Sequence, residues 1–234
     1  MNKREAQPFV IVGQGRCGSN LLKFSLKQNN FVSVVGELYN KNVYNDVFDF
    51  DGASRAHQYY ENQFKKSSIV AAGFKLFAHQ ATKKPAKSVW RYLVKEKVKV
   101  IHLERRNKVD RLISLEVANA TGSFLKHSES NEYELHQLDF PVSWWRERIK
   151  NEYKIEAQLS KRFSNNPYLH VYYEDLVVDW FERTGDIQRF LGVPVQQIDK
   201  AIEKQESKSK SDRLNNYNEL VSAFEGTDYE WMFL

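Results

Sequence analysis

The sequence predicts an α/β protein with a mostly parallel central sheet flanked by helices. Two observations carry this prediction. Short apolar or β-branched runs recur along the chain, and stretches with apolar residues at helical spacing separate them. Such alternation is typical of parallel strands joined by crossover helices. The 234 residues suffice for one large domain, and because no linker divides them, we expect a single domain over residues 1–234.

The expected strands share a short apolar run that ends in polar residues or glycine. In chain order they are residues 9–12, 31–35, 69–77, 98–103 and 169–173. The expected helices share apolar residues about three or four positions apart. They are residues 21–26, 87–97 and 106–120, a longer segment from Pro141, residues 186–191, which end before Gly192, and residues 196–204. Residues 40–66 have little periodicity and are expected to form a cap.

Charge and composition exclude several classes of protein. Lys and Arg exceed Asp and Glu by 5, which favours an anionic ligand. The lysines of residues 83–99 alternate with apolar residues, as in a solvated helix, so we expect no nucleic-acid partner. The lone Cys17 forbids an intrachain disulfide, and without a cysteine pair or closely spaced histidines we expect no metal site. No leader or long apolar run is evident, which predicts a cytoplasmic protein without a membrane span.

A glycine-rich loop, GQGRCGSN at residues 13–20, joins the first expected strand to the first expected helix. Backbone N–H groups and a helix N-terminus meet there, which predicts binding of a phosphate or sulfonate. The spacing from Gly13 to Gly18 matches the phosphate-binding pattern G-x-x-x-x-G, but Ser19 stands where nucleotide triphosphate sites carry Lys. The positive charge lies instead at Arg16. We expect Cys17 to fill a small position in the loop, because no relay that would make it a nucleophile is evident.

A second anion site is predicted after the strand at residues 98–103. Arg106 follows this strand, and Ser114 lies eight residues later, about two helical turns along the next helix. Ligands of open α/β sheets bind at the carboxyl ends of the strands. We therefore expect Arg106 and Ser114 to face a common ligand.

Together the two motifs resemble the sulfotransferases that use 3′-phosphoadenosine 5′-phosphosulfate (PAPS). In that family a strand, loop and helix hold the 5′-phosphosulfate, and an Arg with a Ser eight residues on holds the 3′-phosphate. The stretches YEDL at 173–176 and FLGVP at 190–194 are similar to further family elements. The tail at residues 216–231 is similar to the ending of bacterial carbohydrate-type members, including trehalose sulfotransferase-like enzymes. The resemblance covers residues 9–231 and implies a fold of the P-loop nucleotide-kinase type.

The resemblance implies a role for each matched position. It assigns the 5′ end of the donor to the loop residues Gly15, Arg16, Cys17, Gly18, Ser19 and Asn20. It assigns the 3′-phosphate to Arg106 and Ser114, and an adenine contact to Tyr173. The basic segment that closes over the donor in the family corresponds to Lys208, Lys210 and Arg213, and the sequence leaves open which of them does so.

Attack by an acceptor hydroxyl requires a base beside it and cations near the donor. Glu37 is the first candidate base, because it ends the strand at 31–35 and matches the Gly-Glu position of trehalose-type members. His79 is the second, because Lys75 and His79 are similar to the Lys-x-His element of cytosolic members, with two more residues between them. We expect Lys75 to contact the bridging oxygen of the donor or to end a strand.

We therefore expect sulfonyl transfer from PAPS to the hydroxyl of a small-molecule or glycan acceptor, with adenosine 3′,5′-bisphosphate (PAP) as product and without a metal. A carbohydrate or glycolipid acceptor is favoured by the resemblance. Residues 40–66 and 121–141 are expected to form cap segments on the acceptor side. Two alternatives stay open: an ATP-dependent phosphotransferase of the P-loop kinase type, and a nucleotide-binding module without catalysis. The oligomeric state is not encoded in any pattern of the sequence.

Overall fold

The computed structural model describes residues 6–46, 49–122, 137–201 and 209–234. These residues form two compact units, each with its own hydrophobic core. The first unit consists of the described parts of Met1–Glu104 and Glu156–Ile202, and the second of the described parts of Arg105–Ile155 and Glu203–Leu234. The expectation of one domain over the whole chain stays a prediction.

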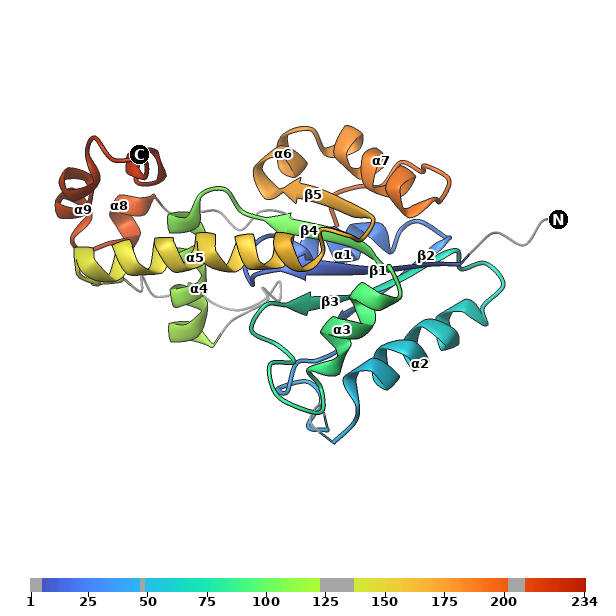
Figure 1. The fold of residues 1–234 in the computed structure, drawn as a ribbon. Helices are drawn as coiled ribbons and strands as arrows, with labels where there is room; N and C mark the ends of the chain where they lie inside the picture. The colour runs from blue at the N-terminus through green and yellow to red at the C-terminus, as the bar shows by residue number, and fades with distance from the viewer. Residues whose placement is uncertain (1–5, 47–48, 123–136, 202–208) are drawn as a thin grey trace. The chain divides into compact units, whose positions relative to one another are not determined.

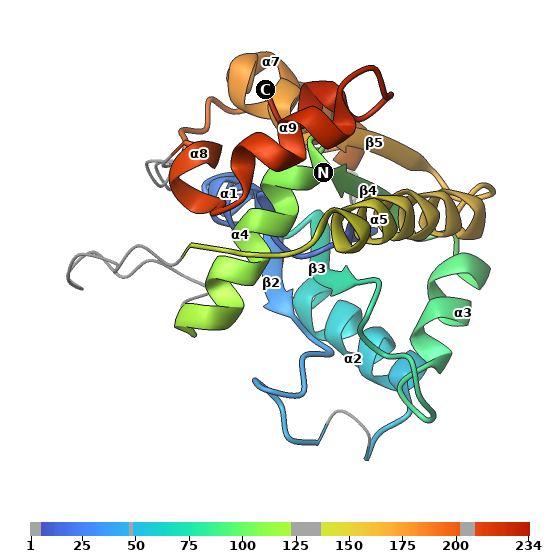
Figure 2. The same ribbon diagram turned by 90° about the vertical axis from the view of Figure 1, so that its left-hand side faces the viewer.

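A five-stranded sheet forms the centre of the first unit, in the order β2-β3-β1-β4-β5 with every pair parallel. Its strands are β1 (Gln7–Gly13), β2 (Val32–Glu37), β3 (Ala71–Phe77), β4 (Lys99–Glu104) and β5 (Tyr168–Tyr172). Figure 1 shows the arrows pointing the same way, and Figure 2 views the sheet from the side toward which they point. The predicted α/β fold with a mostly parallel sheet is confirmed.

Helices cover both faces of this sheet (Figures 1 and 2). They are α1 (Ser19–Leu26), α2 (Gly52–Phe64), α3 (Ser88–Lys95), α6 (Tyr173–Val178) and α7 (Trp180–Leu191). Ile11 of β1 packs in one core with Leu22 of α1 and Leu191 of α7. On the other face, Phe74 of β3 contacts the rings of α2, with its centroid 5.6 Å from that of Tyr60. Because side chains alternate along a strand, Lys75 faces the α1 side.

Helix α2 was not expected from periodicity, since residues 40–66 are rich in polar side chains. The helix begins because Asp51 caps it, accepting a hydrogen bond from the Ser54 N–H at 3.0 Å. It is held on the sheet by Ala56 and Tyr60, which are buried, and the Tyr60 hydroxyl donates to the Phe9 carbonyl at 2.8 Å. Residues 52–64 therefore form a crossover helix between β2 and β3. The acceptor-side cap expected over residues 40–66 stays a prediction.

The helix expected at residues 196–204 is absent from residues 196–201, and residues 202–204 lie outside the described part. Side chains satisfy the backbone there instead. Trp180 donates to the Ile198 carbonyl at 2.9 Å, and Gln188 accepts from the Gln196 N–H at 2.9 Å. Ile198 is buried between these contacts, so tertiary packing replaces the helical hydrogen bonds.

The second unit is helical in its described residues. It contains α4 (Lys108–Thr121), most of α5 (Val142–Arg162), α8 (Lys210–Arg213), α9 (Tyr217–Phe224) and the short 3₁₀ helix η1 (Glu230–Met232). Leu112, Trp145, Ile149, Phe224 and Phe233 are buried in its core. None of the helices in the described part of the chain is long and apolar enough to cross a membrane.

Candidate active site

The glycine loop connects β1 to α1, and two of its glycines are required by the packing around them. A Cβ on Gly13 would lie 2.3 Å from the Leu103 carbonyl oxygen of the neighbouring strand. Gly18 has φ +84°, and a Cβ there would lie 2.4 Å from the ring of Tyr173. By contrast, a Cβ on Gly15 would meet no atom within 4 Å. The loop therefore packs tightly against the protein at Gly13 and Gly18, whereas Gly15 has space around its Cα.

The start of α1 has the electrostatic character of an anion site. Its N-cap is Gly18, no side chain caps it, and the first turn has no acidic residue. The N-terminal N–H groups and the positive end of the helix dipole are therefore not balanced by a carboxylate of the helix itself. Arg16 lies in the same loop and is half-buried, with φ +70°. These features fit the phosphosulfate end of the predicted donor.

Cys17 is 1% exposed and packs in the apolar core of the first unit. Its Sγ lies 4.0 Å from the Gly15 carbonyl oxygen. A thiol buried in this way is typical of a structural cysteine, whereas reactive thiols are partly exposed. The contribution of Cys17 to an anion site is thus its backbone.

Lys75 lies at the centre of a polar cluster beside the loop. It is only 2% exposed, and its Nζ donates to Asn20 Oδ1 at 2.6 Å and contacts Ser19 Oγ at 3.5 Å. It also lies 3.3 Å from Glu37 Oε1, because Lys75 and Glu37 are register partners on β3 and β2. Burial lowers the pKa of Lys75, and the neighbouring Glu37 carboxylate opposes that shift. The cluster joins Glu37, Lys75, Ser19 and Asn20, which the sequence assigned separately.

The second carboxylate oxygen of Glu37 is held by two amides that sequence reasoning missed. Oε2 accepts from Asn40 Nδ2 at 2.7 Å and from Gln80 Nε2 at 2.8 Å. Gln80 is fixed in turn, since its Oε1 accepts from the Phe77 N–H at 3.1 Å. Both amides lie in the turns that follow β2 and β3. Their place just after a strand end was the signal available in the sequence. The carboxylate is therefore held in one orientation.

The other predicted residues of the first unit lie near the same strand ends. Tyr173 begins α6 with its ring against Gly18, so the structure brings it to the glycine loop. His79 is exposed in the turn after β3, with its ring centroid 5.9 Å from that of Phe77. The roles of both residues stay predictions.

In the second unit, Arg106 precedes α4 and Ser114 lies within it, and both are partly buried. Lys210 lies in α8, where its Nζ donates to the Leu234 carbonyl at 2.8 Å and lies 3.7 Å from Asp110 Oδ1. Arg213 ends the same helix. Lys208 lies outside the described residues. The assignment of these side chains to the donor stays a prediction.

A family model described as the sulfotransferase domain matches residues 6–232. The chain belongs to the sulfotransferase domain family. Nodulation protein H of Rhizobium tropici is 26% identical over 240 residues, covering 97% of this chain and 93% of that protein. A sulfotransferase from Alicyclobacillus acidocaldarius has a similar structure, with 18% identity, a TM-score of 0.50, and coverage of 94% of this chain and 92% of that one. The sulfotransferase domain of the curacin biosynthetic pathway has 12% identity and a TM-score of 0.50, covering 98% and 89% of the two chains.

Family membership confirms two predictions, that the chain is a sulfotransferase and that it is an enzyme of the class that uses PAPS. The likeness to the solved structures confirms the sulfotransferase fold. The acceptor and the site residues are not decided by these comparisons.

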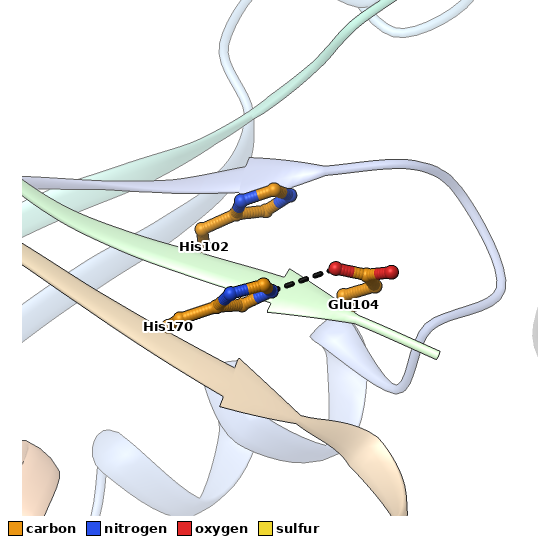
Figure 3. A group of neighbouring side chains, drawn as sticks. All are labelled: His102, Glu104 and His170. Atoms are coloured by element: carbon orange, nitrogen blue, oxygen red, sulfur yellow. Dashed lines mark hydrogen bonds and ion pairs between the residues drawn. The ribbon is translucent and has the colours of Figure 1, made fainter. Parts of the chain in front are cut away.

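The sulfotransferase also carries a group of potential metal ligands, His102, Glu104 and His170, whose ligand atoms lie within 4.8 Å of one another (Figure 3). Hydrogen bonds already engage them. His102 contacts Glu156 Oε2 at 2.6 Å through Nε2 and the Tyr168 hydroxyl through Nδ1, and His170 Nε2 bonds Glu104 at 2.7 Å. The imidazoles are stacked, with centroids 4.7 Å apart and planes 4° from parallel. Because ring nitrogens bind metals in the ring plane, this arrangement favours hydrogen bonding over ion binding.

Proposed function

We propose that this sulfotransferase moves the sulfonyl group of PAPS to a hydroxyl group of a carbohydrate or glycolipid and releases PAP. The observation that carries the proposal is the contact of Lys75 with Glu37, Asn20 and Ser19 at the start of α1, where the glycine loop ends. A cation and a carboxylate beside an anion-binding loop are the groups that sulfonyl transfer to an alcohol requires. The carbohydrate class of acceptor rests on the resemblance of the tail at residues 216–231.

On the donor side, the loop N–H groups, Ser19 and Arg16 bind the phosphosulfate oxygens. The space at Gly15 supports this role, since a Cβ added there would meet no atom within 4 Å beyond its neighbours in the chain. Tyr173 contacts the adenine. The resemblance assigns the 3′-phosphate to Arg106 and Ser114, which gives the protein a means to prefer bisphosphorylated over monophosphorylated adenosine.

On the acceptor side, Glu37 is the general base. Its Oε1 takes the proton of the acceptor hydroxyl while the hydroxyl oxygen bonds to sulfur and the bond from sulfur to the 5′-phosphate oxygen breaks. The electron pair of that bond remains on the phosphate, where Lys75 and Arg16 stabilise the added charge. Asn40 and Gln80 keep the carboxylate aimed, because each donates to its other oxygen. Holding reacting groups in place removes part of the entropic barrier.

The test removes the base without removing its volume. Glu37→Gln should lower kcat by about a hundredfold or more, a typical contribution of a general base, with little change in the dissociation constant of PAP. Transfer is measured with radiolabelled PAPS against saccharides, glycolipids and phenols. Glu96→Gln is the matched control, because it removes a charge from an exposed glutamate elsewhere in the first unit.

Unchanged turnover in Glu37→Gln together with a loss in His79→Asn would move the base to His79. Transfer confined to phenols would contradict the acceptor class. Binding of PAP without transfer to any of these acceptors would indicate a nucleotide-binding module, and activity with ATP and magnesium in place of PAPS would indicate a phosphotransferase.

A further inference from the structure

A buried chain of hydrogen bonds connects the glycine loop to the strands β4 and β5. It begins at Gln14, the second residue of the loop, whose side chain is among the buried polar groups of the first unit. Its Nε2 donates to Glu156 Oε1 at 2.8 Å, across 142 residues of sequence. Gln14 thus ties the loop to the carboxyl-terminal part of α5, which belongs to the same unit.

Glu156 continues the chain. It is 5% exposed, and its second oxygen, Oε2, accepts from His102 Nε2 at 2.6 Å. His102 is fully buried, and its Nδ1 contacts the Tyr168 hydroxyl, which lies 3.1 Å from Ser160 Oγ. We call Gln14, Glu156, His102 and Tyr168 the loop-anchoring chain.

A second hydrogen-bonded pair, His170 and Glu104, faces the loop-anchoring chain. The ring of His170 stacks on that of His102 at 4.7 Å, and His170 bonds Glu104 Oε2 at 2.7 Å (Figure 3). The position of the His102 ring is therefore fixed by stacking on one face as well as by hydrogen bonds at both nitrogens. Each member of the loop-anchoring chain therefore has a defined partner.

Such a chain restricts the loop because breaking any of its hydrogen bonds costs free energy. A buried carboxylate is tolerated only when partners satisfy it, and removing one partner leaves the desolvation penalty of the other uncompensated. Gln14 is accordingly confined to one position. Three residues of the loop have positive φ: Gly13 at +150°, Arg16 at +70° and Gly18 at +84°. For Arg16, a residue with a Cβ, this conformation persists only when the surroundings impose it.

We propose that Gln14, acting through Glu156 and His102, is a positioning residue for the sulfonyl donor. It holds the glycine loop in its anion-binding conformation before the donor arrives, so that binding does not have to order the loop. Pre-organisation of this kind raises affinity without adding a contact to the ligand. The inference rests on the proposed function, in which the loop N–H groups bind the phosphosulfate.

The test compares Gln14→Ala with a control that breaks a buried amide contact far from the loop. Asn166→Ala is matched, because Asn166 is also a buried amide of the first unit and donates at 2.9 Å to the carbonyls of Leu93 and Val98. The probe is PAP, whose binding to the full-length protein is measured by calorimetric titration. KM for PAPS, kcat and thermal unfolding are measured on the same variants. Gln14→Ala should weaken the binding of PAP and raise KM for PAPS, each by about tenfold, which is equivalent to about 1.4 kcal/mol. The kcat at saturating donor should stay within about twofold of the wild-type value. Asn166→Ala should lower the melting temperature and leave the affinity unchanged.

A conservative replacement of Glu156 and a double variant distinguish a positioning role of Gln14 from a general effect on stability. Glu156→Gln keeps an oxygen that accepts from Gln14 and should retain most of the affinity, whereas Glu156→Ala should match Gln14→Ala. The double variant Gln14→Ala/Glu156→Ala should lose no more than either single variant, because both break the same chain. If Gln14→Ala does not fold, the comparison of Glu156→Gln with Glu156→Ala carries the test.

Three results would overturn the inference alone: wild-type affinity in Gln14→Ala, an equal loss of affinity in Asn166→Ala, or additive losses in the double variant. A wild-type protein that does not bind PAP would overturn the proposed function, and the inference with it.

Discussion

Replacing Gly15 and Gly18 separately by Ala distinguishes a glycine kept for a ligand from one kept for the fold. Gly18 has φ +84°, and its added Cβ would overlap the Tyr173 ring at 2.4 Å. Gly15 lies outside the left-handed region, and its added Cβ would meet no atom within 4 Å. The same methyl group should therefore damage folding at one position and ligand binding at the other.

The expected magnitudes follow from these contacts. For Gly18→Ala, the left-handed conformation costs about 1–2 kcal/mol, and displacing the Tyr173 ring costs about 1–3 kcal/mol more. A loss of about 2–5 kcal/mol in a chain of this length lowers the melting temperature by roughly 4–20 °C. Gly15→Ala meets no strain in the protein and restricts the unfolded chain, so stability should be unchanged or higher by up to about 1 kcal/mol.

The assays are thermal unfolding and calorimetric titration with PAP. Gly15→Ala should unfold at the wild-type temperature or slightly above it and bind PAP at least about tenfold more weakly, because the Cβ projects into the open side of the loop. If Gly15→Ala binds PAP as the wild type does, the loop is not the donor site. If Gly18→Ala unfolds at the wild-type temperature, the packing argument is refuted.

Three further outcomes are expected. Arg106→Ala should abolish the preference for PAP over AMP, measured by titrating both nucleotides, and equal affinities in the wild type would contradict the assignment. Burial, with repulsion from Lys75, lowers the pKa of Lys23 from 10.5 to about 8, so the unfolded chain binds more protons between these values and folding gains stability as pH rises through them. Lys23→Met should therefore raise the melting temperature below pH 8 and lose this advantage above pH 10.5, and an equal gain at both would contradict it. Glu152→Gln should cost about 3 kcal/mol in urea unfolding, because it removes a buried counterion of Arg111, whose side chain is 3% exposed, and a loss below about 1 kcal/mol would contradict this expectation.

The strands and the glycine loop could be predicted because their signals are local. The apolar run at residues 9–12 and the glycines that follow it indicate a strand, a turn and a helix without reference to the rest of the chain. Helix α2 could not be predicted from its period, because only a few of its side chains are buried and its position depends on contacts such as Tyr60 with Phe9. The helix expected at 196–204 was wrong over the described residues 196–201, since contacts with Trp180 and Gln188 outweighed local propensity.

Within the candidate site, sequence patterns identified Glu37 and Lys75 separately, but their contact depends on the register of β2 against β3. Gln80, Asn40 and Gln14 carry no motif at all. Polar amides are common in turns, and nothing local distinguishes one that holds a carboxylate from one that faces water. Their hydrogen-bond partners can be identified only from the three-dimensional structure.

By itself the sequence predicted the kind of chemistry, because a strand, a glycine loop and a helix in that order are typical of sites where backbone N–H groups bind an anion, and all three can be read within residues 9–26. Tertiary structure alone decided how that site is supported. The orientation of Glu37 and the anchoring of Gln14 by Glu156 depend on side chains up to 142 residues apart. Glu156 lies on a helix and Gln80 in the turn after another strand, so these contacts follow from how distant elements pack together and not from any local pattern.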